Sequence, residues 1–392
     1  MSVNSDQAPR QEIAPLAEHA PVIPEHVFQR LQHIQPPALL YDLRAFKKSV
    51  RQVVEAFDAY YFPVKCNPTP EILKAAAQQG AGLDVCSPQE FVLAMKSGVK
   101  SRDISHTGVA LDSGGMSDMN SLGVRINLDS IQELEQWLVG LLGQPAALRL
   151  KAGENDGYAT KFGISDVDLS VALKKIRAAG TRLEGLHVHF DHVAENPTDL
   201  ALEYAPTLTK ITTLLADHMP DISYLNLGGG WPFFHGARQQ MGPLDFAAAI
   251  QKQFGRSLKE AGFSGEIIVE PGEFVAADCG YWVAKVAVLK PGEQQTVAIL
   301  DTITPIPSAK LPYPVTVLRK KNGRFHPVTG ERTRCYTLTG VANSPLDTIR
   351  ESVRLPELKP EDIIVLGGVG AYLGTLMGGF HSRPTPKQYV VE

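Results

Sequence analysis

The feature that most constrains this chain is a regular alternation of short β-type runs and longer helical stretches between residues 60 and 272. Eight runs are predicted as strands: 60–65, 82–87, 104–108, 124–128, 147–152, 185–190, 224–230 and 266–272. Alternating strands and helices favour parallel β/α architecture. Because eight such units can close on themselves, we expect a (β/α)8 barrel.

The stretches between the runs carry start and stop signals of helices. Thr69 precedes Pro70, which suits the first helical position, and Gly80 ends that helix. Residues 87–90 (SPQE) form a capping box at the start of the next helix. Residues 112–120 are poor in helix formers, so the third helix is expected to be weak. Later helices are predicted at 130–142, 165–179, about 198–218 and 244–261.

The pattern changes from about residue 285 onward. Strand-like segments separated by Pro, Gly and Lys-Asn-Gly turns replace the alternation, at 283–289, 296–301, 334–339 and 362–366. We therefore expect a barrel over 37–284 and a mainly β domain over 285–392. Residues 1–36 are rich in Pro and polar groups, and we expect them to be partly disordered and to add to the β domain.

Composition excludes several classes of protein. The formal net charge of −4 is unlike the basic surface of a nucleic-acid binder. No apolar run is long enough to span a membrane, and the N-terminus lacks the pattern of a secretory signal. The four cysteines are scattered without a CxxC pair, which argues against a disulfide framework or zinc knuckle and favours a reducing cytoplasm.

The predicted barrel brings a particular set of side chains to one rim. Active sites of such barrels lie at the carboxyl ends of the strands. The polar and glycine residues expected there are Lys65, Asp84, Arg149, Lys151, His187, His189, Gly228, Gly229, Gly230, Glu270 and Gly272. This set of groups on one rim suits pyridoxal 5'-phosphate, a phosphorylated aldehyde that a lysine can hold. It contains a lysine, an arginine, histidines, a glycine run and a glutamate.

Each group has a chemical task in such a site. Lys65 follows an apolar and aromatic strand, so burial is expected to lower its pKa and make the amine a nucleophile. The run 228–230 lets backbone N–H groups approach a phosphate closely. Glu270 would keep a pyridine nitrogen protonated, which makes the ring an electron sink. A lone lysine at a strand end is more often a surface residue, so the prediction depends on the convergence of these groups.

Other chemistry remains open from the residues alone. His187, His189 and His192 form an HxHxxH cluster that suits a metal-dependent hydrolase, although no second cluster of His, Asp and Glu completes a site. Ordinary packed histidines are a further alternative. Residues 367–370 (GGVG) lack the GxGxxG spacing of a dinucleotide site and are predicted as turns leading to Tyr372.

Six ordered motifs together resemble the fold-type III pyridoxal-phosphate decarboxylases, namely the ornithine, diaminopimelate and carboxynorspermidine decarboxylases, whose barrel is related to that of alanine racemase. The resemblance covers about residues 37–392. The motifs are 61–67 (YFPVKCN), 81–90 (AGLDVCSPQE), 148–151 with 161–164 (LRLK, KFGI), 185–190 (GLHVHF), 225–230 with 269–272 (LNLGGG, VEPG), and 370–372 with 382–384 (GAY, SRP).

The resemblance implies roles around the cofactor. Lys65 would be the Schiff-base lysine, with Asp84 on the following strand also in the cofactor site. His189 would stack on the ring and Arg149 would lie near its phenolic oxygen. Glu270 would pair with the pyridinium. The phosphate would be held by Gly228, Gly229, Gly230, Gly272 and Tyr372.

The resemblance also implies a head-to-tail homodimer whose sites are completed by the partner's segment 339–349. Substrate contacts would come from Glu273, Asn343, Asp347 and Tyr372. Three departures stand out. Glu273 follows Glu270-Pro271-Gly272 where ornithine and diaminopimelate decarboxylases carry an arginine, which favours an amine-bearing substrate. Asn343 takes the place of a cysteine, which leaves the Cα protonation to Lys65 or a water. Asp191 and His192 replace a glycine and a serine near the phosphate.

The predicted function is decarboxylation of an amino acid or conjugate to an amine and CO2. A basic or amine-bearing substrate, as in polyamine or siderophore biosynthesis, fits Glu273. A racemase or epimerase using the same cofactor remains an alternative, as do the metal-dependent hydrolase and a non-catalytic regulatory subunit. No nucleic-acid or membrane partner is expected.

Overall fold

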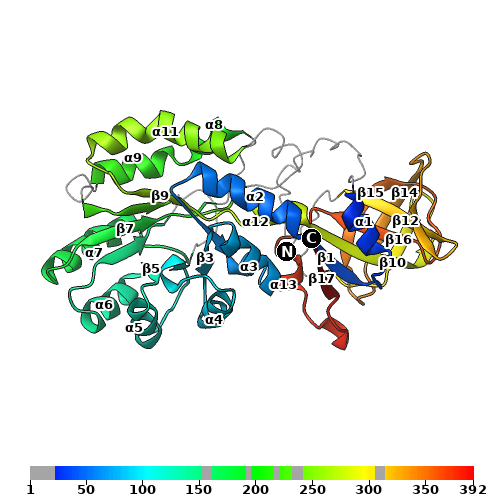
Figure 1. Cartoon of the computed structure of the whole chain (residues 1–392), viewed down its shortest axis with the longest axis horizontal. Coiled ribbons are helices and arrows are strands. Elements are labelled where there is room, and N and C mark those ends of the chain that lie inside the picture. Colours follow the sequence, from blue (N-terminus) through cyan, green and yellow to red (C-terminus); the bar gives the residue numbers. More distant parts are fainter. Residues whose placement is uncertain (1–22, 152–160, 191–195, 215–220, 232–241, 305–313) are drawn as a thin grey trace, which may run out of the picture.

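The computed structural model describes residues 23–151, 161–190, 196–214, 221–231, 242–304 and 314–392. A closed barrel occupies one end of the long axis and a mainly β sheet the other (Figure 1). The barrel strands are β2 (Ala59–Pro63), β3 (Gly82–Val85), β4 (Ile104–His106), β5 (Arg125–Leu128), β6 (Ala146–Arg149), β7 (Leu183–His187), β8 (Tyr224–Asn226) and β9 (Glu266–Val269). All eight expected strands are present and parallel, and β9 pairs with β2 to close the barrel.

Helices cover the outside of the barrel. They are α2 (Leu43–Ala56), α3 (Pro70–Gln78), α4 (Pro88–Lys96), α5 (Ser113–Ser121), α6 (Ile131–Gly140), α7 (Asp166–Ala178), α8 (Pro197–Glu203), α9 (Ala205–Leu214) and α11 (Pro243–Glu260). The Ser87 hydroxyl caps α4 through the Glu90 N–H, as the capping box predicts. No helix in these described ranges is long and apolar enough to cross a membrane.

Two helices differ from the prediction. The weak third helix forms a full α5, because Asp112 caps it through the Gly115 N–H at 2.8 Å and Met116 and Met119 are buried. The helix predicted at about 198–218 is two helices, α8 and α9, which meet at Tyr204; residues 215–218 lie outside the described part. Tertiary burial and a cap thus outweigh low helix propensity.

The second part of the molecule is a nine-stranded sheet. Its strands are β1 (Ala38–Asp42), β10 (Gly280–Lys290), β11 (Thr296–Leu300), β12 (Val315–Lys321), β13 (Arg324–Pro327), β14 (Arg334–Thr339), β15 (Thr348–Leu355), β16 (Ile363–Gly367) and β17 (Lys387–Val391). Along the sheet the order is β13-β12-β16-β10-β11-β14-β15, and β1 lies between β10 and β17.

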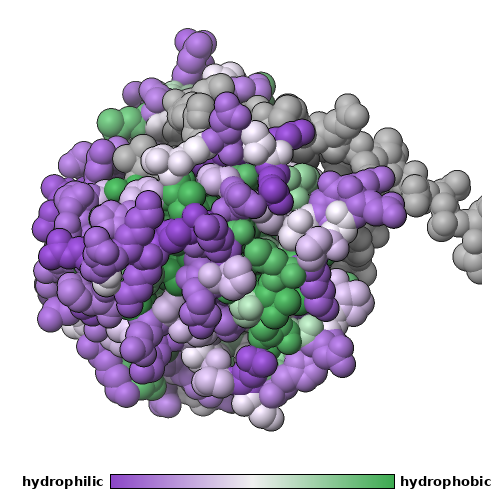
Figure 2. Space-filling model, turned by 90° about the vertical axis from the view of Figure 1, so that its right-hand side faces the viewer, coloured by the Kyte–Doolittle hydropathy of each residue, from purple (hydrophilic) through white to green (hydrophobic). Residues whose placement is uncertain are grey.

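The N-terminal boundary of the barrel differs from the expected one. Residues 38–42, expected within the barrel, form β1 and pair with β10 and β17. The strands β12, β13, β15 and β17 were also not predicted, since their charged residues obscure the apolar pattern. Helix α1 (Glu25–Leu31) buries Val27 and Leu31 against this sheet, so this helix packs on the β domain. Seen end-on, this domain is largely hydrophilic, with a hydrophobic patch near its centre (Figure 2).

The link between the two parts positions the active site. Strand β9 leads through the short helix α12 (Glu273–Ala276) and a 3-10 turn, η4 (Ala277–Cys279), into β10, so one continuous segment joins barrel and sheet. Gly280 and Gly370 cross so closely that a Cβ on Gly280 would lie 2.1 Å from the Gly370 nitrogen. This crossing brings Tyr372 to the barrel, where its N–H donates to the Cys66 carbonyl at 2.8 Å.

Candidate active site

A cavity of about 250 Å³ opens where the barrel strands end. The residues that line it are Pro63, Lys65, His189, Gly230, Glu270, Gly272, Glu273 and Tyr372. Seven of these eight were predicted from the sequence as cofactor or substrate residues. They come from the ends of β2, β7, β8 and β9 and from the segment after β16, and the fold brings them together around one space.

Lys65 lies in a single 3-10 turn, η1 (Val64–Cys66), directly after β2. Its Nζ lies 3.5 Å from the Cys86 Sγ. Burial alone lowers the pKa of Lys65, but the negative charge of Asp84 and smaller contributions from other neighbours outweigh it, so the pKa is raised. The expected lowering was therefore wrong for the cofactor-free chain. The sequence shows the apolar strand that buries Lys65, but it does not show that the Asp84 carboxylate on the neighbouring strand β3 lies close to the amine.

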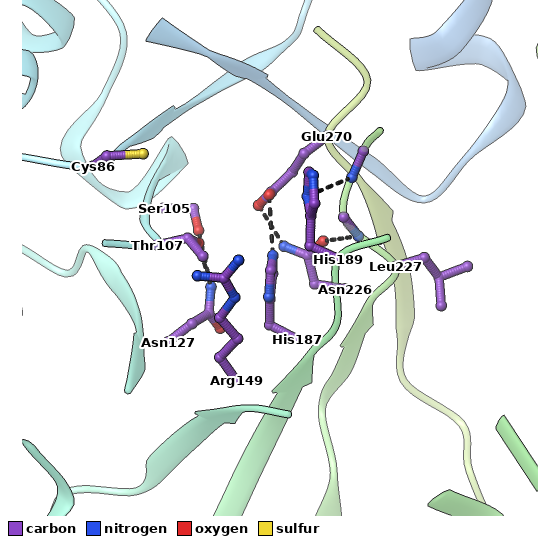
Figure 3. A network of polar contacts seen from close by, with 12 residues as sticks. Cys86, Ser105, Thr107, Asn127, Arg149, His187, His189, Asn226, Leu227 and Glu270 are labelled. Carbon is purple, nitrogen blue, oxygen red and sulfur yellow. Dashed lines mark hydrogen bonds and ion pairs between the residues drawn. The ribbon is translucent and has the colours of Figure 1, made fainter. Parts of the chain in front are cut away.

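Glu270 is held as an anion at the end of β9. Its carboxylate is buried, with Oε2 3.2 Å from the His187 Nε2 and Oε1 accepting from the Asn226 Nδ2 at 2.6 Å (Figure 3). Burial alone raises the pKa of Glu270, but the hydrogen bonds from His187 and Asn226 and the positive charge of Lys65 outweigh it, so the pKa is lowered. Burial lowers the pKa of His187, so its neutral ring donates from Nε2.

His189 is a neutral ring on the same side of the cavity. Its Nδ1 accepts from the Gly229 N–H at 3.2 Å, so the proton lies on Nε2. Burial lowers the pKa of His189 to about 3. A neutral imidazole that lines the cavity suits stacking on an aromatic ring, the role that the resemblance implies.

The glycines at the strand ends are required by close backbone approach. Gly228 has a φ of +65°, and a Cβ there would lie 2.3 Å from the Val188 carbonyl oxygen. A Cβ on Gly229 would lie 2.3 Å from the Glu270 carbonyl oxygen. Gly230, the next residue, lines the cavity. The backbone thus forms a cradle free of side chains, which fits a phosphate.

Tyr372 reaches the cavity with a strained backbone. Its φ is +59°, in the left-handed region that non-glycine residues rarely occupy. Such strain is concentrated at functional sites. The phosphate role expected for Tyr372 is compatible with this position, as is a contact with the substrate.

Arg149 is the last residue of β6 and is 8% exposed. Its Nη1 lies 3.0 Å from the Asp129 Oδ1, which also accepts from the Gly163 N–H at 3.1 Å. The Arg149 guanidinium also lies 4.5 Å from the centre of the Phe162 ring. The sequence analysis did not predict Asp129. Its carboxylate contacts Arg149 in the motif at 148–151 and Gly163 in the motif at 161–164, so the pairing of these two motifs was the available signal.

Asn343 and Asp347 do not line the cavity within one chain. Both lie in the loop between β14 and β15, in the β domain. The buried Asp347 carboxylate accepts from the Thr304 N–H at 2.8 Å and the Ala342 N–H at 2.6 Å. The Asn343 N–H donates to the His381 Nε2 at 3.1 Å. Asp347 therefore shapes this loop, and its carboxylate is already occupied by backbone donors.

The described residues give the metal alternative no support. They contain no group of three or more His, Cys, Asp or Glu side chains that could hold a metal ion. His187 and His189 contact different partners, Glu270 and Gly229. His192 and Asp191, which would complete the cluster, lie outside the described residues.

Comparison with known proteins agrees with this geometry. Residues 43–277 match the family model of the pyridoxal-dependent decarboxylases, pyridoxal binding domain. The chain belongs to the pyridoxal-dependent decarboxylase family. It is 25% identical to a diaminopimelate decarboxylase of Deinococcus radiodurans over 369 residues, which is 91% of this chain and 90% of the relative. It is 26% identical to the Helicobacter pylori enzyme of the same name over 388 residues, covering 92% and 91%.

Solved structures share the whole fold. Diaminopimelate decarboxylase of M. jannaschii with L-lysine has a TM-score of 0.80 at 21% identity, covering 93% of this chain and 88% of that one. The Vibrio vulnificus lysine/ornithine decarboxylase with putrescine has a TM-score of 0.76 at 21% identity, covering 94% and 99%. The chain is thus an amino-acid decarboxylase that uses pyridoxal phosphate, and these relatives give the racemase alternative no support.

Proposed function

We propose that the substrate is an amino acid whose side chain carries an amine or another basic group. Glu273 carries this proposal, because it lines the cavity together with Lys65 while no arginine lies among the described lining residues. A carboxylate in a small enclosed space attracts a cationic tail and repels an acidic one. An amine from polyamine or natural-product synthesis is the class of product that fits.

The residues present fit pyridoxal phosphate. Bound there, the cofactor would supply an aldehyde for amine capture and a cationic ring that draws electrons from the α-carbon. Lys65 would hold it covalently, Glu270 would keep the ring nitrogen protonated and His189 would cover the ring. Gly228 to Gly230, Gly272 and Tyr372 would hold the phosphate, and Arg149 and Asp84 would face the ring's polar edge.

The reaction consumes one proton for each CO2 released. The α-carboxylate leaves as CO2, its bonding electrons stay on the α-carbon, and a proton must then be placed there. Lys65 is the only amine among the described lining residues, and its raised pKa favours the ammonium that can give this proton. Glu270 stays anionic throughout, which suits an electrostatic role.

A homodimer is part of the proposal. The loop that holds Asn343 presents Leu346 at 64% exposure, and the segment after Tyr372 presents Leu376 at 59% and Phe380 at 48%. Exposed apolar side chains near a loop with no role inside its own barrel suit a contact with a second copy. Sedimentation equilibrium on the purified protein measures the molecular mass in solution and so distinguishes a dimer from a monomer.

The charge of Glu273 gives the sharpest test of the substrate class. We expect wild-type protein to release CO2 from amino acids with cationic tails, and Glu273→Gln to lose about tenfold or more in kcat/KM on these, a change of about 1.4 kcal/mol. Glu273→Arg should shift the preference toward acidic tails. Asp278→Asn, five residues later and away from the lining set, is the matched control. Equal activity of wild type and Glu273→Gln across cationic, neutral and acidic substrates would exclude the proposal.

A further inference from the structure

The thiol of Cys86 lies beside the amine of Lys65. Cys86 follows β3 directly, and its Sγ is 3.5 Å from the Lys65 Nζ. Figure 3 shows the sulfur pointing inward, toward the side on which Glu270 and His189 lie. The Cys86 N–H donates to the Glu90 Oε2 at 2.8 Å, which fixes the backbone of this residue. The contact between sulfur and amine is thus built by the fold.

The site needs such a group. With pyridoxal phosphate bound, exchange of Lys65 for the substrate would free the lysine as a neutral amine, yet the α-carbon needs a proton once CO2 has left. Asn343 stands where the related decarboxylases carry a cysteine, and a carboxamide does not act as an acid at ordinary pH. Among the other described lining residues, Glu270 is anionic and His189 is a neutral ring. Burial raises the pKa of the Tyr372 phenol, and Glu273 is the anion assigned to the cationic tail of the substrate.

We propose that Cys86 is the proton donor to Lys65, replacing the thiol that is absent at position 343. The Sγ–H proton passes to the lone pair of the displaced Lys65 amine, which leaves a thiolate beside an ammonium. After CO2 has left, the ammonium gives one N–H proton to the electron pair on the α-carbon and becomes a neutral amine again. The neutral amine would then be free to hold the cofactor again, and a proton from solvent restores the thiol.

The surroundings of the pair support this direction of transfer. The groups that act on the Cys86 thiol are Asp84, Lys65 and Glu90. Burial, with the charge of Asp84, raises the pKa of Cys86 to about 12, so the sulfur keeps its proton until the amine takes it. The same Asp84 raises the pKa of Lys65 and so favours the ammonium. Cys86 is only half-buried, which leaves a path for solvent protons.

The inference rests on decarboxylation with Lys65 as the cofactor-bearing amine, and it is tested with Cys86→Ser and Cys86→Ala. We expect kcat to fall on the order of 10²-fold, the effect of losing a positioned proton donor, with KM little changed. More turnovers should end as an aldehyde with the amine form of the cofactor, which arises with one water when the proton misses the α-carbon. Cys335→Ser, a half-buried thiol on β14, is the matched control.

A second measurement needs no turnover. In the cofactor-free protein, the rate of Cys86 alkylation by iodoacetamide is followed against pH by mass spectrometry. Lys65→Met should slow it at a given pH, because loss of the neighbouring cation raises the thiol's pKa further. Unchanged kcat and aldehyde fraction in Cys86→Ala, or alkylation insensitive to Lys65→Met, would overturn the proposal. If the wild type decarboxylates no basic amino acid, the proposed substrate fails while the alkylation result still stands.

Discussion

The residues at the mouth of the barrel are held by side chains from neighbouring strands, whereas the loop between β14 and β15 is held by backbone groups near an exposed surface. Glu270 is 4% exposed and bonded by His187 and Asn226. In the loop the buried side chain is that of Asp347, and its carboxylate is bonded by two N–H groups. Leu346, one residue earlier, is 64% exposed.

This difference separates two tasks. The barrel fixes charge and orientation for the chemistry within a single chain, since the partners of Lys65, His189 and Glu270 come from other strand ends of the same barrel. The loop fixes only its own shape and presents its other side chains outward. We therefore expect variants of the barrel residues to change the reaction itself, and variants of the loop to change stability first.

The largest expected effect comes from Glu270→Gln, which keeps the size of the side chain but removes its charge. Without the anion the ring nitrogen of the cofactor loses its partner, and kcat should fall on the order of 10² to 10³-fold. Steady-state kinetics on the cofactor-loaded enzyme give this value. Glu266→Gln, at the exposed start of the same strand, should leave kcat unchanged. A Glu270→Gln enzyme with wild-type kcat would show that the negative charge of Glu270 is not needed for the reaction.

Asp347→Asn should produce a smaller effect, and a different one. The carboxylate accepts charge-assisted hydrogen bonds from Thr304 and Ala342, so loss of its charge should cost about 2 kcal/mol in the free energy of unfolding. Urea denaturation of the cofactor-free protein measures this. Ser344→Ala in the same loop, where the hydroxyl accepts one surface N–H, should stay within about 0.5 kcal/mol. A fall in kcat without any loss of stability would contradict the assignment of Asp347 to loop shape.

The smallest effect concerns pH and a buried histidine of the barrel. Burial lowers the pKa of His106, on β4, to about 4, whereas an unfolded histidine titrates near about 6.5. As the pH falls between these values, the unfolded state binds the proton first, so the folded state loses stability by up to about 1.4 kcal/mol per pH unit.

His106→Gln should therefore show less loss of stability than wild type between pH 6.5 and 5.5, by about 1 kcal/mol. Thermal or urea unfolding at the two pH values provides the measurement. His326→Gln, on the exposed strand β13, is the control and should follow the wild type. Identical pH dependence of His106→Gln and wild type would show that the barrel interior admits the imidazolium.

The sequence by itself predicted the eight barrel strands and most of the cavity lining. The alternation of strand and helix is local, and parallel strands all end at one rim, so Lys65, His189, Gly230 and Glu270 had to converge once the barrel was recognised. The β domain was harder, because strands such as β13 and β17 carry charged residues, and β17 pairs with β1, which lies far away along the chain.

Only the tertiary structure decided how the converging groups act on one another. Asp84 raises the pKa of Lys65, the Asn226 amide donates to Glu270, and Asp129 pairs with Arg149, each between adjacent strands of the barrel. The contact of Cys86 with Lys65 has the same origin. The spacing of residues in the sequence predicts which side chains reach the rim. The distances between these side chains are set by strand register and barrel closure, and the electrostatics of the site depend on those distances.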